Sequence, residues 1–400
     1  MVPGLRKQFN ASFSKETYQA YLNEMSRYLS APIPFRLAET PVFVDQKLTE
    51  KILHACESIV DLICDSDFQR LTANSIPSEE FVPDESSFSH MISFDFAVCR
   101  NAEGELEPQL IEMQGFPTLY AFQVHMSNTL EQYYDLPGNY SPYLNGYNQD
   151  SYLQMLRRLL LGNHAPEHVI LLELKPEHQK TLVDFNCTKE YTGIETVCIT
   201  KLIAEGRKLF YLKEGVKTPI HRIYNRLIFD DLKAHQEDLG PVIDLTQGWD
   251  VEWVPHPNWF YRISKYTLPF IRHPFVPETF FLNEVKQLPS DLEHYVLKPL
   301  FSFAGQGVLI DVTPEDLEKI NDPQHYILQR KVNYAEVIET PDGPAKVEIR
   351  MMYVWPEGDQ RPHAAINLAR ISKGKMIGVR YNQDKEWVGG SIAYFEQSAD

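Results

Sequence analysis

The sequence predicts an α/β protein, and three observations along the chain support that class. Apolar residues recur with helical spacing in the first third, over residues 14–30 and 47–64. A strand pattern at residues 169–174, a helical pattern and a second strand pattern at 194–199 then follow one another. Strand patterns dominate the last third. Because βαβ order favours a parallel sheet with a right-handed crossover, the middle of the chain predicts a Rossmann-like layer.

The other elements follow from the same two periodicities. Strand patterns at 92–98 and 109–114 predict a hairpin around a turn at 101–104. Thr313, as an N-cap before a proline, predicts the start of a short helix. Further helices are expected at 119–133, 151–161 and 176–191, the last opened by Pro176 and ended by Gly193. Further strands are expected at 209–224, 326–332, 346–355, 363–371 and 375–381.

The composition argues against nucleic-acid and membrane partners. The chain has 400 residues, and its 38 basic and 55 acidic residues give a net charge of −17, which repels anionic polymers and surfaces. An anion site must therefore be a local concentration of Lys and Arg. Five cysteines without a CxxC pair argue against a disulfide framework and for a reducing compartment. The start lacks a signal-peptide core and no apolar run reaches membrane length, so a cytoplasmic location is expected.

Residues 295–308 form the most informative segment. An apolar strand delivers Lys298 to a proline, and a loop with Gly305 and Gly307 follows. A buried lysine is costly unless it meets an anion, and glycines two apart let backbone N–H groups turn toward the same anion. The segment predicts a polyphosphate site. On this segment alone, a hairpin with a solvated lysine is an equally good interpretation.

The hairpin at 92–114 carries a second polar group. With its turn centred between Glu103 and Gly104, Asp95 is expected directly opposite Glu112, and Gln114 projects from the same face. Two carboxylates and an amide oxygen are ligands that suit Mg²⁺. The neighbouring positions are mostly apolar, which favours metal ligation over the alternative, a solvent-facing side of the hairpin.

The order of these motifs resembles that of the circularly permuted ATP-grasp superfamily, and of glutathionylspermidine synthase-like proteins in particular. The resemblance covers about residues 90–130 and 165–390. It is carried by Asp95, the Glu112-Met113-Gln114 triplet, the βαβ segment, Trp259 through Ser264-Lys265, and Val296-Leu297-Lys298-Pro299 with its glycine loop.

The resemblance implies an α/β (α+β) chain with a circularly permuted ATP-grasp fold and a Rossmann-like substrate (pre-ATP-grasp) domain. A helical N-terminal segment is expected at 1–90, and the metal-ligand hairpin with its helices at 91–164. The substrate domain is expected at 165–258 and the ATP-grasp nucleotide-binding unit at 259–400.

The resemblance also implies site residues. Asp95, Glu112 and Gln114 stand at the Mg²⁺ ligands, and Arg350 at a catalytic contact to a phosphate or acyl phosphate. The ATP-binding residues implied are Lys265, Lys298, Ser302, Ala304, Gly305, Gln306, Gly307, Gln329, Arg330, Lys331 and Val332. Arg370 and Asn382 are further candidates for the cleft wall.

The activity implied is an ATP- and Mg²⁺-dependent carboxylate–amine ligase that acts through an acyl phosphate on a small-molecule or peptide carboxylate. Two positions depart from the family pattern: Ser93 replaces an arginine, and Gln114 replaces the usual asparagine. These departures favour a second interpretation, a degenerate relative that binds nucleotide without turnover. A third is a carboxylate kinase that releases the acyl phosphate.

Overall fold

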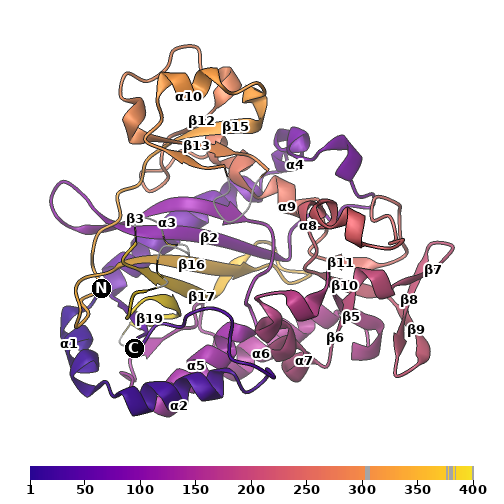
Figure 1. Cartoon of the computed structure of the whole chain (residues 1–400), viewed down its shortest axis with the longest axis horizontal. Coiled ribbons are helices and arrows are strands. Elements are labelled where there is room, and N and C mark those ends of the chain that lie inside the picture. Colours follow the sequence, from indigo (N-terminus) through magenta and orange to yellow (C-terminus); the bar gives the residue numbers. More distant parts are fainter. Residues whose placement is uncertain (302–306, 375–376, 378–381, 383, 399–400) are drawn as a thin grey trace.

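The computed structural model describes residues 1–301, 307–374, 377, 382 and 384–398. Helices and five sheets alternate along the chain, so the predicted mixed α/β class is confirmed. Figure 1 shows a small upper lobe, a long antiparallel sheet through the middle, and a parallel sheet on the right.

A five-stranded antiparallel sheet forms the centre, in the order β18-β17-β16-β2-β3. Its strands are β2 (Met91–Arg100), β3 (Leu106–Gln114), β16 (Lys346–Val354), β17 (His363–Ser372) and β18 (Gly389–Ser391). Because side chains alternate along a strand, Phe94 and Ile349 pack with α3 (Gln46–Ile63) in a hydrophobic core. Asp95 and Arg350 therefore lie on the opposite face.

The upper lobe holds a four-stranded antiparallel sheet in the order β12-β15-β13-β14. Its elements are β12 (Thr279–Phe281), β13 (Tyr295–Pro299), β14 (Leu309–Ile310), α10 (Pro314–Glu318) and β15 (Tyr326–Arg330). Leu297 and Leu328 belong to a separate small core within the lobe, whereas Ile327 belongs to the main core shared with the central sheet. Lys298 pairs with Ile327 in register, so it shares the face that looks toward the central sheet.

The upper lobe confirms two local predictions. Val296 pairs with Ile310 across β13 and β14, as expected for a hairpin around the glycine loop. Thr313 caps α10 with a complete capping box to Asp316. Residues 302–306 of the loop lie outside the described residues.

The third sheet is parallel, in the order β11-β10-β5-β6. Its strands are β5 (Val169–Glu173), β6 (Glu195–Cys198), β10 (Arg222–Asn225) and β11 (Glu252–Val254), and the nearby helices are α5 (Phe122–Tyr133), α6 (Gln149–Leu161) and α7 (Leu182–Thr192). The predicted βαβ unit is confirmed, and Gly193 ends α7 in the left-handed conformation with a φ of +79°. The start of α7 was predicted wrongly. Lys175 is left-handed, Pro176–His178 forms a single 3₁₀ turn and Gln179 is extended, so the helix begins at Leu182.

Two three-stranded sheets complete the chain. They contain β1 (Val42–Val44), β4 (Tyr140–Ser141) and β19 (Ala393–Glu396), and β7 (Ile203–Glu205), β8 (Lys208–Lys213) and β9 (Val216–Ile220). The other helices are α1 (Pro3–Ser12), α2 (Lys15–Met25), α4 (Phe68–Leu71), α8 (Phe229–Ala234) and α9 (Trp259–Arg262). Helices α2 and α3 confirm the two N-terminal helical patterns.

The strand predicted at 375–381 falls almost wholly on positions outside the described residues. Within the described part, no helix combines the length and the apolar character needed to cross a bilayer.

Candidate functional site

A network of buried charges lies on the polar face of the central sheet. The Asp95 side chain on β2 is 1% exposed and stands directly across from Arg350 on β16. Nε and Nη2 of Arg350 each donate to one Asp95 carboxylate oxygen at 2.6 Å. Nη2 of Arg370, from β17, donates to Oδ2 of Asp95 at 2.8 Å. Both oxygens of this predicted metal ligand are therefore held by guanidinium groups.

The network continues to Glu348 on β16. Arg370 forms an ion pair with Glu348, and the Tyr334 hydroxyl donates to the same carboxylate at 2.8 Å. Burial raises the pKa of Glu348, while Arg370 opposes the increase. Burial alone would also raise the pKa of Asp95, but the charges of Arg350 and Arg370 outweigh it and the pKa is lowered.

Strand β3 supplies the other two predicted metal ligands. Glu112 pairs with Asp95 in register, which confirms the pairing predicted from the hairpin turn. Nε2 of Gln114 donates to Oε1 of Glu112 at 2.9 Å, and Nη2 of Arg350 lies 3.7 Å from the same oxygen. The ladder shifts register next to this pair, which leaves Ile111 as the extra residue of a bulge.

The bulge joins the central sheet to the upper lobe. Nζ of Lys298, on β13, donates to the Ile111 carbonyl at 3.0 Å and to Oε1 of Gln329 at 2.5 Å. Lys265 Nζ donates to the Pro299 carbonyl at 3.0 Å. Three predicted phosphate contacts, Lys265, Lys298 and Gln329, thus lie close to the predicted metal ligands of the central sheet.

Both lysines are held in surroundings that disfavour their charge. Burial lowers the pKa of Lys298, against the opposing charges of Glu112 and Glu348. Burial likewise lowers the pKa of Lys265 to about 8, although Glu112 raises it. A bound anion would favour the charged form of each lysine.

The cluster also contains donors without an acceptor. Among the described residues, Nε2 of Gln329 and Nε of Arg370 are buried and have no hydrogen-bond partner. The cluster contains three carboxylates (Asp95, Glu112 and Glu348) and four cations (Lys265, Lys298, Arg350 and Arg370). With all seven groups ionised, its net charge is +1, whereas the whole chain carries −17. Unpaired buried donors and excess positive charge suit an anion with several oxygen atoms.

The predicted metal set fits a cation less well. Glu112 and Gln114 offer oxygen atoms, but both oxygens of Asp95 are engaged by arginines. No group of three His, Cys, Asp or Glu side chains in the described part of the chain is arranged to hold a metal ion. In this arrangement, the three residues do not fit Mg²⁺.

The remaining predicted nucleotide residues lie apart from this cluster. Arg330 contacts Asp291 at 3.3 Å and covers the Tyr295 ring at 5.5 Å, and Lys331 forms an ion pair with Asp311. Val332 follows β15 and is partly buried, and Gly307 is exposed with a φ of +70°. The predicted residues Ser302, Ala304, Gly305 and Gln306 lie outside the described residues.

Two members of the network were missed by the sequence reasoning. Glu348 stands two residues before Arg350, so strand alternation around the predicted Arg350 would have found it. Tyr334 lies in an irregular segment, where no periodicity indicates its direction. Arg370, a candidate for the cleft wall, is a central member of the network.

A second polar group lies at the carboxyl ends of the parallel strands, where open α/β sheets bind ligands. Arg226 follows β10, lies over the Phe116 ring at 4.6 Å and donates to the Thr118 hydroxyl at 3.2 Å. Its Nε is buried and, among the described residues, has no partner. Burial raises the pKa of Glu173, at the end of β5, to about 7, although Arg226 opposes the increase.

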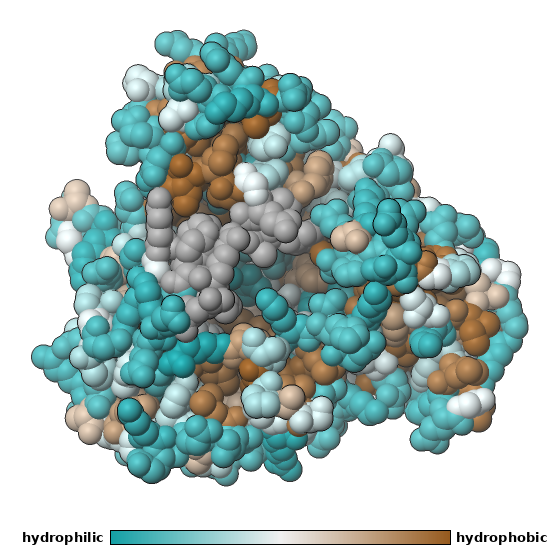
Figure 2. Space-filling view, in the orientation of Figure 1, coloured by the Kyte–Doolittle hydropathy of each residue, from teal (hydrophilic) through white to brown (hydrophobic). Residues whose placement is uncertain are grey.

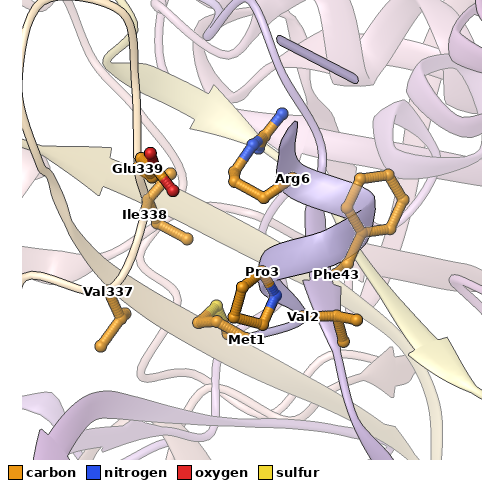
Figure 3. Close-up of a pocket in the computed structure, with 8 residues that line it drawn as sticks. All are labelled: Met1, Val2, Pro3, Arg6, Phe43, Val337, Ile338 and Glu339. Atoms are coloured by element: carbon orange, nitrogen blue, oxygen red, sulfur yellow. The ribbon is translucent and has the colours of Figure 1, made fainter. Parts of the chain in front are cut away.

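Two hollows lie elsewhere, at the N-terminal helix. A cavity of about 80 Å³ is lined by Met1, Val2, Pro3, Arg6, Phe43, Val337, Ile338 and Glu339 (Figure 3). A second, of about 300 Å³, shares Phe43 with the first and is also lined by Phe9 and Pro137. Neither is lined by a member of the charge network. Figure 2 shows that apolar side chains gather on the part of the upper lobe that faces the middle of the molecule.

Comparisons with known proteins support the fold. No family model matches the chain, and no curated protein matches it. Among solved structures, the chain is similar to a glutathione synthetase-like effector from Globodera pallida in its apo form. The TM-score is 0.57 at 11% identity, and the match covers 97% of this chain and 98% of the other. At this identity the similarity shows a shared fold, that of a glutathione synthetase-like protein.

Proposed function

We propose that this protein is an ATP- and Mg²⁺-dependent carboxylate–amine ligase that forms amide or peptide-like bonds through an acyl phosphate. The observation that carries the proposal is the cationic cluster between the upper lobe and the central sheet. Lys265 and Lys298 have lowered pKa values there, beside buried donors that have no acceptor among the described residues. An anion with many oxygen atoms, such as a triphosphate, supplies the hydrogen-bond acceptors and the negative charge that this cluster lacks.

The fold supports the choice of ATP-grasp chemistry. Two antiparallel sheets face each other across the cluster, and the chain shares its fold with a glutathione synthetase-like effector. We propose the circularly permuted form, because the hairpin with Asp95 and Glu112 precedes the parallel sheet in the chain. A substrate domain at 165–258 and a nucleotide unit at 259–400 belong to this proposal.

The proposed nucleotide contacts divide between phosphates and base. Lys265, Lys298 and the glycine loop (302–307) are assigned to the phosphates, with Gln329 beside them. Residues 330–332, at the end of β15 and directly after it, are assigned to the adenine side.

The reaction proposed needs no nucleophilic side chain. A substrate carboxylate attacks the γ-phosphorus of ATP, the bond to the β-phosphate oxygen breaks, and an acyl phosphate and ADP form. The amine then attacks the acyl carbon and displaces phosphate. Arg350 and Arg370 are assigned to the negative charge that develops on the transferring oxygens. Exclusion of water protects the acyl phosphate from hydrolysis.

We assign the carboxylate substrate to the carboxyl ends of the parallel strands. Arg226 presents a buried Nε without an acceptor among the described residues, and a guanidinium edge suits a carboxylate. Thr118 and Thr181 hydroxyls lie at 3.2 and 3.5 Å from the same side chain. A small-molecule or peptide carboxylate is the substrate class that this polar group supports.

A second candidate is a nucleotide-binding protein without turnover. Ser93 provides no positive charge where the resembling family has an arginine, and Asp95 is engaged by two arginines. A carboxylate kinase is a third candidate, because the same groups serve acyl phosphate formation without an amine.

The test is ADP formation with Mg²⁺-ATP, pools of amino acids and short peptides as carboxylates, and hydroxylamine as trap. ADP and hydroxamate that require both the carboxylate pool and Arg226 support the proposed ligase chemistry. Nucleotide binding without ADP would favour the protein without turnover. Hydroxamate that forms equally well when hydroxylamine is added after the enzyme is removed would favour the kinase, because the acyl phosphate has then left the site.

A further inference from the structure

We propose that the smaller cavity beside α1 is a binding site for a small carboxylate with a short apolar tail, which the guanidinium group of Arg6 holds. This is the cavity of about 80 Å³ that Figure 3 shows. It lies apart from the charge network of the central sheet, so the inference goes beyond the proposed ligase function and does not depend on it.

The guanidinium group of Arg6 is a buried cation without a counterion. Arg6 is 5% exposed, and its one hydrogen bond among the described residues runs from Nη1 to the Pro41 carbonyl at 3.1 Å. Nε and Nη2 are buried and have no partner in the described part of the chain. Burial lowers the pKa of Arg6 to about 10, although the charge of Glu339 opposes the decrease. Since a buried charge is costly unless it is paired, these two donors indicate an anion.

The two unpartnered nitrogen atoms form the edge of the guanidinium group that suits a carboxylate. In the central sheet, Arg350 binds both oxygens of Asp95 through its own Nε and Nη2. The carbon atom of the Arg6 guanidinium lies 5.0 Å from the centre of the Phe9 ring and 5.9 Å from that of Phe43. These rings fix the position of the group, and its Nε and Nη2 edge stays available to a pair of oxygen atoms.

The lining of the cavity sets the class of ligand. Figure 3 shows Arg6 and Glu339 toward one end, and Met1, Pro3 and Val337 toward the other. The other walls are apolar as well, so they offer water few hydrogen-bond partners. One water molecule needs about 10–15 Å³ on the same measure, so the cavity has room for a carboxylate with a tail of a few carbon atoms.

Glu339 opposes an anion only in part. Its side chain is exposed, and its backbone carbonyl accepts a hydrogen bond from Nδ2 of Asn10 at 3.0 Å, which attaches this segment to α1. Because water and salt screen an exposed charge, Glu339 should weaken the binding of a carboxylate without preventing it.

The first test titrates sodium propionate into the full chain at constant ionic strength and follows the methyl signal of propionate by proton NMR. We expect saturable binding by the wild type with a Kd on the order of 1 mM, as suits a ligand of few atoms. Propionamide has the same shape without the charge and should bind about 10-fold more weakly or worse. Lack of saturable propionate binding, or its displacement by an equal concentration of sodium chloride, would overturn the proposal.

The second test compares variants in the same titration. Arg6→Met should lose about 10-fold or more in affinity for propionate, because the paired hydrogen bonds are gone. Arg27→Met, at an exposed arginine, is the matched control and should bind as the wild type does. Glu339→Gln changes an exposed side chain and should bind propionate more tightly, because it removes the opposing charge. Equal affinities of wild type and Arg6→Met, or weaker binding by Glu339→Gln, would contradict the proposed site. If Arg6→Met does not fold, the titrations of the wild type and Glu339→Gln still decide.

Discussion

Arg350 and Asp95 are 255 residues apart in the chain, yet they face each other across adjacent strands with two hydrogen bonds of 2.6 Å. The pair joins the N-terminal hairpin to the C-terminal half of the central sheet. Arg350 also lies 3.7 Å from Glu112, whose charge raises the pKa of Lys265 and of Lys298, so this buried ion pair connects fold stability with the chemistry proposed for the site.

The first prediction concerns the stability that Asp95 contributes. Asp95→Asn keeps the shape of the side chain but removes the negative charge to which Arg350 and Arg370 both donate. Breaking a buried pair by removing one partner costs about 3–5 kcal/mol, and we expect a decrease of that size in the free energy of unfolding. Urea denaturation at pH 7 measures it. Glu112→Gln is the matched control with an expected loss below about 1 kcal/mol, because Glu112 is 30% exposed and 3.7 Å from Arg350. Equal losses for the two variants would contradict the account.

The second prediction concerns pH. Burial lowers the pKa of Lys265 from 10.5 to about 8, so above pH 8 the ligand-free protein holds this lysine neutral. An anion favours the charged form, so nucleotide binding takes up a proton and the affinity should fall as pH rises from 8 to 9.5. Lys265→Met should flatten this dependence, whereas Lys319→Met, at an exposed lysine, should keep it. Calorimetry in buffers of different ionisation enthalpy measures the proton uptake.

The lowered pKa of Lys265 also predicts how the stability of the ligand-free protein changes with pH. Between pH 8 and 10.5 the unfolded chain binds more protons at Lys265 than the folded protein, so this group makes the ligand-free protein more stable as pH rises. The difference in unfolding free energy between wild type and Lys265→Met should therefore shift in favour of the wild type across this window. A shift in the opposite direction would mean that Lys265 is not buried as a disfavoured charge.

The third prediction concerns Gly115, which follows the site strand β3. Its N–H donates to the Ile263 carbonyl at 2.8 Å, and a Cβ placed there would lie 2.3 Å from the Trp259 carbonyl oxygen. Backbone must move to admit alanine, so we expect Gly115→Ala to lower the unfolding free energy by about 1–3 kcal/mol and to weaken nucleotide binding. Gly240→Ala is the control, because nothing lies within 4 Å of its added Cβ. Unchanged stability in Gly115→Ala would show that α9 does not hold the end of β3.

Local sequence rules predicted the parts of the site that lie close together in the chain. The pairing of Asp95 with Glu112 was predicted correctly, but the turn is centred on Glu103 rather than between Glu103 and Gly104, and the bulge at Ile111 restores the predicted pairing. The N-cap at Thr313 located α10. The helical spacing of apolar residues located α2 and α3 for the same reason. Each of these features depends on residues within about one element of each other.

The ion pairs of Asp95 could not be predicted in this way. They depend on β16 lying beside β2, and no local pattern says which distant strand is the neighbour. The prediction that the Asp95 carboxylate is available to a metal ion therefore rested only on residue spacing within the hairpin. The early start predicted for α7 failed for a local reason, because Gln179 is extended and separates the 3₁₀ turn at Pro176–His178 from the helix.

The most direct test of the central claim is calorimetric titration of ATP with Mg²⁺ into wild type, Lys298→Met and the control Lys319→Met. Lys298 is a half-buried cation that bridges the upper lobe and the Ile111 carbonyl, whereas Lys319 is exposed. We predict binding by the wild type and by Lys319→Met, and a loss of about 100-fold or more in Lys298→Met, since an unpaired phosphate charge costs about 3 kcal/mol. Wild-type protein that does not bind ATP, or a Lys298→Met variant that binds it equally well, would contradict the account.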